Sequence, residues 1–245
     1  AVFGLPYHSV EGLAYSLMRL MGLELPVPDH TQMSQRARRL QVVISRKERQ
    51  EPMHLVVDPT GLKIYGEGEW KVRQHEAGKR RTWRKVHLAV DGHAKDVIGV
   101  EVTTVDWADC EVFEGLVEQV EGELEQIDAD GAYDTRQAYV VAAARKTKLV
   151  VPPRENAVPW EKDHPRNAVL EQVAQRGMAE WKKESGYHRR SITENAMYRL
   201  KLLFGDSLAS LIETQVTEVH TRIAALNVMT YLGMPVSVRV GTILP

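Results

Sequence analysis

Residues 54–61, His54-Leu55-Val56-Val57-Asp58-Pro59-Thr60-Gly61, join a short apolar run to a turn sequence. A continuous apolar run that ends in turn residues is typical of a strand buried inside a sheet. We therefore expect a central strand over residues 54–57, with Asp58 at its end. A carboxylate in such a place is costly unless it is paired or binds a metal. An ordinary turn-initiating aspartate is the alternative, because Asp-Pro-Thr-Gly is a common turn sequence.

Strands and helices alternate downstream of this strand. Residues 83–90 and 97–102 predict two strands joined by an Asp91-Gly92 hairpin turn. The later elements expected are a helix over 108–120, a strand over 124–129, a helix over 135–145, a strand over 148–151, a polar region over 152–186 with one helix near 167–183, a helix over 191–204 and one or two helices over 206–232. This order predicts a mixed α/β fold, with one mixed sheet flanked by helices.

An N-terminal helical segment precedes the first strand. Residues 8–23 have apolar positions at helical spacing, and two prolines then interrupt the helix. Asp29 or Thr31 can cap a second helix that runs to about residue 44. We expect residues 1–50 to form this segment, either helix-turn-helix-like or used in dimerisation. Because residue 1 is Ala, we also expect an N-terminal piece to be missing.

The composition excludes few classes of protein function and is less informative than the motifs. Hydrophobic residues make up 43% of the chain and charged residues 27%, which is ordinary for a soluble globular protein. No apolar stretch approaches the ~20 residues that cross a bilayer, and no signal peptide is evident. The single cysteine, Cys110, fits a reducing cytoplasm. The net charge of -1 does not favour nucleic acid, although clustered basic residues permit a basic face.

A second acidic candidate lies in the run Asp128-Ala129-Asp130-Gly131-Ala132-Tyr133-Asp134. A short strand again ends in an acid followed by glycine, which allows the backbone to turn sharply. Strand alternation places Asp128 and Asp130 on the same side, so periodicity does not choose between them, and Asp134 competes with both. A helix cap or a surface turn is the alternative.

The third candidate, Glu194, lies near the start of a helix. Ser191-Ile192-Thr193-Glu194 fits a capping box, in which the glutamate merely closes the first turn. At about 100° per residue, however, Arg190, Glu194 and Lys201 fall within about 40° of one another. The apolar residues expected on the opposite side are Ile192, Ala196, Leu200 and Leu203. We therefore expect a helix that packs by one face and carries a polar stripe on the other.

Two strand ends and one helix can supply three carboxylates to a two-metal site. Magnesium takes oxygen ligands, and two such ions roughly 4 Å apart can activate an attacking oxygen and stabilise a leaving one. The nine histidines are scattered and give no zinc pattern, and His54 and His87 lie in strand patterns that favour structural roles. No GxxxxGK[ST] loop is present, so no nucleotide cofactor is implied.

Three segments resemble the transposases of bacterial insertion sequences. Residues 57–63 with 66–70 are similar to the first-aspartate region of these enzymes, and residues 130–134 are similar to the second. The pattern Tyr187-x2-Arg190-x3-Glu194-x6-Lys201 resembles the signature around their catalytic glutamate. The most similar group is the one named for insertion sequence five, and the resemblance runs from about residue 8 to 232.

This resemblance implies an RNase H-like catalytic domain over residues 51–245 and a DDE-type transposase. Asp58, Asp130 and Glu194 would be catalytic and would bind Mg²⁺, with Mn²⁺ as a substitute. The enzyme would cleave DNA at transposon ends and transfer the freed strand into target DNA. The resemblance also selects Asp130 over Asp128, which the residue pattern did not.

DNA would be the main partner. The resemblance assigns Tyr187, Arg190 and Lys201 to DNA contact or to orienting Glu194. Basic residues between 71 and 85 could bind phosphates without sequence preference: Lys71, Arg73, Lys79, Arg80, Arg81, Arg84 and Lys85. Trp70 and Trp83 could stack on an unpaired base, the alternative being packing within the protein.

Because two transposon ends must meet, we expect a homodimer or a higher synaptic complex, in the bacterial cytoplasm at the nucleoid. Two other functions remain open. One is an RNase H-like nuclease that cuts without joining. The other is a catalytically inactive DNA-binding relic.

Overall fold

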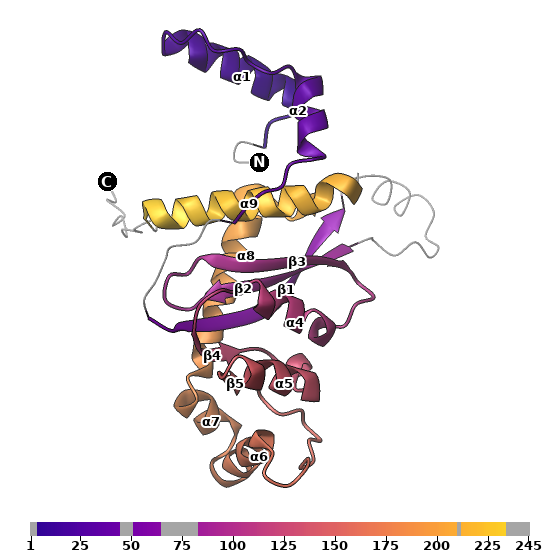
Figure 1. Cartoon of the computed structure of the whole chain (residues 1–245), viewed down its shortest axis with the longest axis vertical. Helices are drawn as coiled ribbons and strands as arrows, with labels where there is room; N and C mark the ends of the chain where they lie inside the picture. Colours follow the sequence, from indigo (N-terminus) through magenta and orange to yellow (C-terminus); the bar gives the residue numbers. More distant parts are fainter. Residues whose placement is uncertain (1–3, 45–50, 65–82, 210–211, 234–245) are drawn as a thin grey trace, which may run out of the picture.

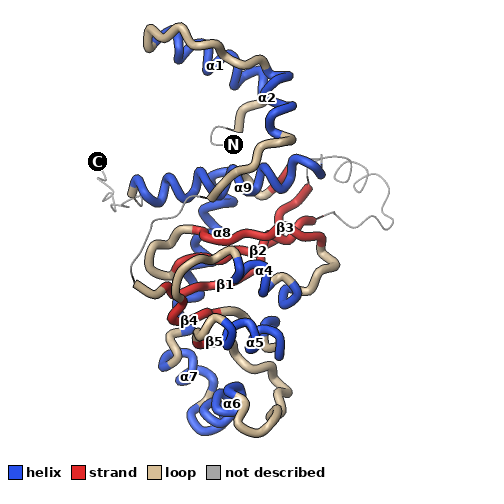
Figure 2. The backbone as a smooth tube through the Cα atoms, in the orientation of Figure 1, coloured by secondary structure: helices blue, strands red, loops and turns tan. Residues whose placement is uncertain are grey.

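A mixed sheet forms the centre of the computed structural model, which describes residues 4–44, 51–64, 83–209 and 212–233 (Figures 1 and 2). The strands are β1 (Met53–Ile64), β2 (Trp83–Asp91), β3 (Val97–Thr104), β4 (Leu124–Asp128), β5 (Lys148–Val150) and the short β6 (Ser207–Leu208). Their order is β3-β2-β1-β4-β5, and β6 pairs separately with the end of β1.

The strand directions complete the topology. β2 is antiparallel to both β1 and β3, whereas β1, β4 and β5 pair in parallel. An antiparallel hairpin thus continues into parallel strands reached through helical crossovers. The mixed sheet flanked by helices that the sequence predicts is therefore confirmed.

The first strand is longer than the sequence predicts. We expected it to end at Asp58, but β1 continues through the Asp-Pro-Thr-Gly sequence to Ile64. Pro59 is tolerated because β4 pairs with β1 only as far as Val56, so at Pro59 only β2 is a neighbour. At Gly61 a Cβ atom would come within 3.1 Å of the Trp83 ring, so the ring packs tightly over this glycine. Asp58 therefore lies inside a strand, just past the point where β4 ends.

Helices cover both faces of the sheet (Figure 2). On one face, α4 (Phe113–Glu118) and α5 (Arg136–Ala144) pack against apolar side chains of the strands, Ala89 among them. On the other face, α8 (Ser191–Phe204) and α9 (Ile212–Leu232) pack against Leu88 and Val90. Successive residues of β2 thus point to opposite sides, as strand geometry requires, and the core has two layers.

Several elements differ from the predicted ones in their ends. The helix expected over 108–120 is a 3-10 turn, η1 (Asp109–Glu111), followed by the shorter α4. The single helix expected near 167–183 is two, α6 (Pro165–Arg176) and α7 (Met178–Glu184). Gly177 separates them with a φ of 82°, a conformation that glycine adopts without strain.

The N-terminal segment consists of α1 (Tyr7–Leu20) and α2 (His30–Ala37). Asp29 caps α2 by accepting a hydrogen bond from the Gln32 N–H, as predicted, although α2 ends before residue 44. The two helices pack against each other beyond α9, away from the sheet (Figure 1). Over the described ranges, every helix is too short or too polar to cross a membrane.

Candidate active site

Asp58 is the most buried of the three predicted site residues. Its exposed fraction is 5%, and it lies opposite Leu88 of β2 within the sheet. Arg190, the last residue of the 3-10 turn η3 (Tyr187–Arg190), donates a hydrogen bond from Nη2 to its Oδ1 over 2.9 Å. A buried carboxylate requires such a partner, so the ion pair explains how β1 tolerates a charge at this position.

Two further carboxylates act on Asp58. Burial raises the pKa of Asp58, Arg190 opposes this, and the negative charges of Asp130 and Glu194 raise it further. The fold therefore brings together the acids predicted from three separate segments. Their oxygens do not all converge on one point. Among the residues described, only His8, Glu11 and His30 form a group whose ligand atoms all lie within 4.8 Å of one another.

Asp130 follows β4 and begins the 3-10 turn η2 (Gly131–Tyr133). Its Oδ1 accepts a hydrogen bond from the Ala132 N–H at 2.8 Å, so the predicted cap is present. This bond fixes the direction of the carboxylate. Within the described part of the chain, no hydrogen bond is recorded for Oδ2, which leaves that oxygen available to a ligand.

The two competing aspartates are engaged elsewhere. Asp128 is fully buried, and its oxygens accept hydrogen bonds from His54 Nε2 (2.8 Å) and Gln126 Nε2 (2.6 Å). Asp134 is also buried and forms a two-pronged ion pair with Nε and Nη2 of Arg166, at 2.6 and 2.7 Å. Both carboxylates are therefore bound by protein groups, whereas Asp130 keeps one oxygen free of them.

Glu194 does not close a capping box. The residue before α8 is Arg190, which has helical dihedral angles and forms no side-chain cap. Ser191 instead donates a hydrogen bond to the carbonyl of His188. The reason is that η3 runs directly into α8, so Ser191 does not stand at a free helix start. Glu194 is exposed in the first turn, and the described residues offer its carboxylate no recorded hydrogen bond.

The polar stripe on α8 is present, and its opposite face is mostly buried. Ala196 and Leu200 belong to the core, and Ile192 packs against it. Leu203 departs from the prediction, because it lies in the last turn of the helix and is 42% exposed. Lys201, the last cation of the stripe, is half-buried.

Tyr187 is a buried neighbour of Arg190. Its ring is buried against Trp181, with ring centroids 6.1 Å apart, and its hydroxyl lies close enough to Arg190 for the two groups to influence each other's pKa. Burial raises the pKa of this hydroxyl, while the Arg190 guanidinium lowers it. Tyr187 therefore holds the cation that pairs with Asp58, and its buried ring offers little surface to an external base.

A second network, which the sequence analysis missed, anchors the same turn. Nη1 of Arg189 lies 3.0 Å from Nδ1 of His54. Because arginine only donates, Nδ1 accepts this bond and the Nε2–H of His54 donates to Asp128. The chain Arg189–His54–Asp128 thus ties η3 to β1 and β4, next to the Arg190–Asp58 pair.

The described basic residues of the 71–85 stretch already have protein partners. Arg84 donates from Nε to Gln215 Oε1 at 2.8 Å. Lys85 donates to the Trp107 carbonyl and to Asp109. The other predicted DNA-binding residues of this stretch lie outside the described residues: Trp70, Lys71, Arg73, Lys79, Arg80 and Arg81. Trp83 packs over Gly61, which agrees with a structural role for this tryptophan.

Three solved structures share part of this architecture. A piggyBac transposase in a synaptic complex with hairpin DNA is 12% identical with a TM-score of 0.46, over 74% of this chain and 47% of that one. The catalytic core of BIV integrase is 9% identical with a TM-score of 0.34, over 71% and 82%. A simian T-cell lymphotropic virus intasome, in complex with a PP2A regulatory subunit, is 11% identical with a TM-score of 0.31, over 89% and 69%. The chain spans about half the length of the piggyBac transposase.

Family membership is shown by the sequence itself. The model of the family described as "Transposase DDE domain" matches residues 49–228, which is most of the chain and includes all three candidate acids. A second model with the same description matches residues 1–67. The chain therefore belongs to the transposases with a DDE domain.

Proposed function

We propose that this protein cleaves DNA at transposon ends and joins the freed strand to target DNA, with Asp58, Asp130 and Glu194 as its catalytic acids. The observation that carries the proposal is the setting of Asp58. It is a buried carboxylate that lies close enough to two other carboxylates, from η2 and α8, for their charges to raise its pKa. Two acids from other elements that lie near one buried aspartate are typical of a functional site.

The residues present fit divalent metal ions, which DDE transposases generally use. The donor set consists only of carboxylate oxygens, as Mg²⁺ prefers, with Mn²⁺ as a substitute. Among the described residues, Arg190 is the cation that pairs with Asp58, and three carboxylates leave a surplus of negative charge that a metal would neutralise. Asp58, Asp130 and Glu194 would hold these ions through their carboxylate oxygens. Bound there, such ions activate an attacking oxygen and stabilise a leaving one.

The side chains around the acids would prepare the site. Arg190 lowers the pKa of Asp58 against the effect of burial and so favours the ionised carboxylate. Tyr187 would help to position the guanidinium of Arg190, whose pKa its hydroxyl raises. Lys201 follows on the same stripe of α8, where a cation suits the phosphates of bound DNA. These residues act on the ligands and on the DNA backbone and are not themselves nucleophiles.

Several broader assignments accompany this proposal. The DNA partners would be transposon ends and target, held by a homodimer or a larger synaptic complex at the bacterial nucleoid. Residues 1–50 would form a unit apart from the catalytic domain over 51–245, which agrees with α1 and α2 packing mainly on each other. The group named for insertion sequence five remains the narrower family prediction.

One assay tests the function against its alternatives. The purified protein is incubated with Mg²⁺, a plasmid target and labelled DNA that carries the sequences flanking its gene. We expect nicked ends and products joined to the plasmid. Cleavage without joining would indicate a plain nuclease. Binding with neither reaction, even in Mn²⁺, would indicate a non-catalytic relic.

A further inference from the structure

The helical hairpin of α1 and α2 lacks a core of its own. Neither helix contains a fully buried residue, although many of their side chains are apolar. Segments of ~40 residues or fewer seldom hold their fold by apolar burial alone and usually need a metal, a disulfide or a partner chain. The only cysteine, Cys110, lies far along the chain in η1, so no disulfide can join the two helices.

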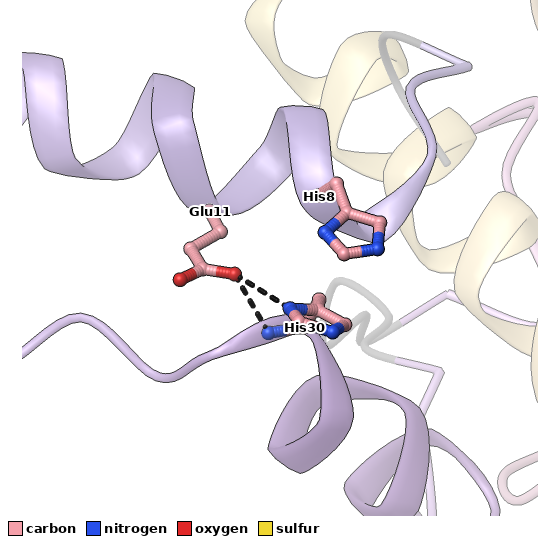
Figure 3. A group of neighbouring side chains, drawn as sticks. All are labelled: His8, Glu11 and His30. Atoms are coloured by element: carbon pink, nitrogen blue, oxygen red, sulfur yellow. Dashed lines mark hydrogen bonds and ion pairs between the residues drawn. The ribbon is translucent and has the colours of Figure 1, made fainter.

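Three potential metal ligands meet between the two helices. His8 and Glu11 lie one turn apart on α1, and His30 is the first residue of α2 (Figure 3). Oε2 of Glu11 lies 3.0 Å from Nδ1 of His30 and also accepts the His30 backbone N–H at 2.9 Å. The rings of His8 and His30 lie with their centroids 3.7 Å apart. One ligand atom from each residue can be chosen so that all lie within 4.8 Å of one another.

We propose that His8, Glu11 and His30 bind one zinc ion that links α1 to α2. Zinc bonds of about 2.1 Å at tetrahedral angles place ligand atoms about 3.4 Å apart. The Glu11–His30 distance already suits this arrangement. The ligand nitrogen of His8 lies within 4.8 Å of the other two ligand atoms. Rotation of this exposed side chain would move the nitrogen the remaining distance of about 1–2 Å and complete the three-ligand site. Two imidazoles and one carboxylate leave a fourth position for water.

Two imidazole nitrogens and one carboxylate favour zinc over Mg²⁺, the metal proposed for the catalytic acids. Imidazole nitrogen suits zinc, whereas magnesium prefers oxygen throughout. The bond from the His30 backbone N–H to Oε2 orients the Glu11 carboxylate, as outer hydrogen bonds commonly do at metal sites. The sequence did not reveal this group because a histidine and a glutamate on α1 and a single histidine after the proline-containing linker match no Cys/His zinc pattern.

Zinc titration of the full chain tests the proposal. Calorimetry is run at pH 7.5 in several millimolar Mg²⁺. Magnesium is included because it prefers the carboxylate oxygens of Asp58, Asp130 and Glu194 to a site that contains histidine. We expect the wild type to bind one zinc ion tightly per chain. The His8→Ala variant should bind it at least tenfold more weakly. This variant is chosen because, among the described residues, the His8 side chain forms no hydrogen bond that the change would break. Glu11→Gln should behave likewise. His220→Ala, a change to a histidine on α9, and Asp58→Asn should bind as the wild type does.

Limited proteolysis supplies an independent readout. Zinc should slow cleavage in the linker between α1 and α2 at least threefold in the wild type and leave the rate unchanged in His8→Ala. Zinc binding by His8→Ala as tight as that of the wild type would overturn the proposal, as would loss of the tight zinc in Asp58→Asn. Because strand cleavage does not enter either readout, failure here leaves the proposed transposase activity untouched.

Discussion

Arg190 and Asp58 form an ion pair across 2.9 Å although 132 positions separate them in the chain. The pair joins the middle of β1 to the residue that precedes α8. The helix that carries Glu194 is therefore attached to the buried aspartate by the cation that lowers the pKa of this aspartate against the effect of burial. Changes at Arg190 should accordingly alter both the charge of Asp58 and the placement of Glu194.

The first prediction concerns pH. Because burial already raises the pKa of Asp58 and Arg190 opposes the rise, Arg190→Gln should raise this pKa further. A carboxylate binds a metal when ionised, so the acid limb of Mn²⁺ affinity should move to higher pH in the variant. Calorimetric titrations from pH 5 to 8 measure this. Arg190→Lys, which retains the charge, is the control and should stay closer to the wild type.

The same shift has a consequence for stability. A carboxyl group whose folded-state pKa is raised favours folding most below its unfolded value and loses that contribution as pH rises through the folded-state value. Metal-free Arg190→Gln should therefore lose more stability between pH 4 and neutrality than the wild type does. Parallel curves of unfolding free energy against pH for the two proteins would contradict the role given to Arg190.

The second prediction separates Asp130 from Asp128. Asparagine caps a helix about as well as aspartate, so Asp130→Asn should keep its melting temperature. It should lose strand cleavage by more than about 100-fold, because changes merely behind metal ligands cost 10–100-fold. Asp128→Asn places a donor against His54 or Gln126 and should cost about 1–3 kcal/mol of stability. Thermal melts and cleavage rates of the two variants should show opposite patterns.

The third prediction concerns the buried pair of Asp134 and Arg166. Removal of one partner leaves an uncompensated buried charge, so Arg166→Met should cost about 3–5 kcal/mol in urea unfolding. The double change with Asp134→Leu should recover part of this loss. The exposed pair of Arg176 and Glu184 is the matched control, and Glu184→Gln should cost less than about 1 kcal/mol. A small effect of Arg166→Met would mean that Asp134 is not committed to this pair.

The sequence predicted the order of the elements well because periodicity and turn residues are local signals. Trp83–Asp91 and Ser191–Phe204 agree closely with the expected ranges. The predicted end of β1 was wrong. The strand continues through Asp58-Pro59-Thr60-Gly61 because β4 does not extend beside Pro59, and the four residues themselves do not indicate where a neighbouring strand ends. The capping box was wrong for a similar reason: the turn before Ser191 is already helical.

Much of the site was accessible only through the family resemblance. Asp128, Asp130 and Asp134 are equivalent in a strand-and-turn pattern, and their different partners become visible only when His54 and Arg166 are placed in space. The resemblance chose Asp130, and the contacts of the other two aspartates agree with that choice. The doublet Arg189-Arg190 was visible in the sequence. Nothing local indicated that its members reach two different buried groups, His54 and Asp58.

The central claim is that Asp58, Asp130 and Glu194 together hold the catalytic metal ions. Anomalous scattering from crystals grown with Mn²⁺ and end DNA tests it most directly. We predict two manganese peaks roughly 4 Å apart, held by the carboxylates of Asp58, Asp130 and Glu194. Manganese absent from Asp58, with Arg190 still paired to it and Glu194 turned toward solvent, would contradict the claim.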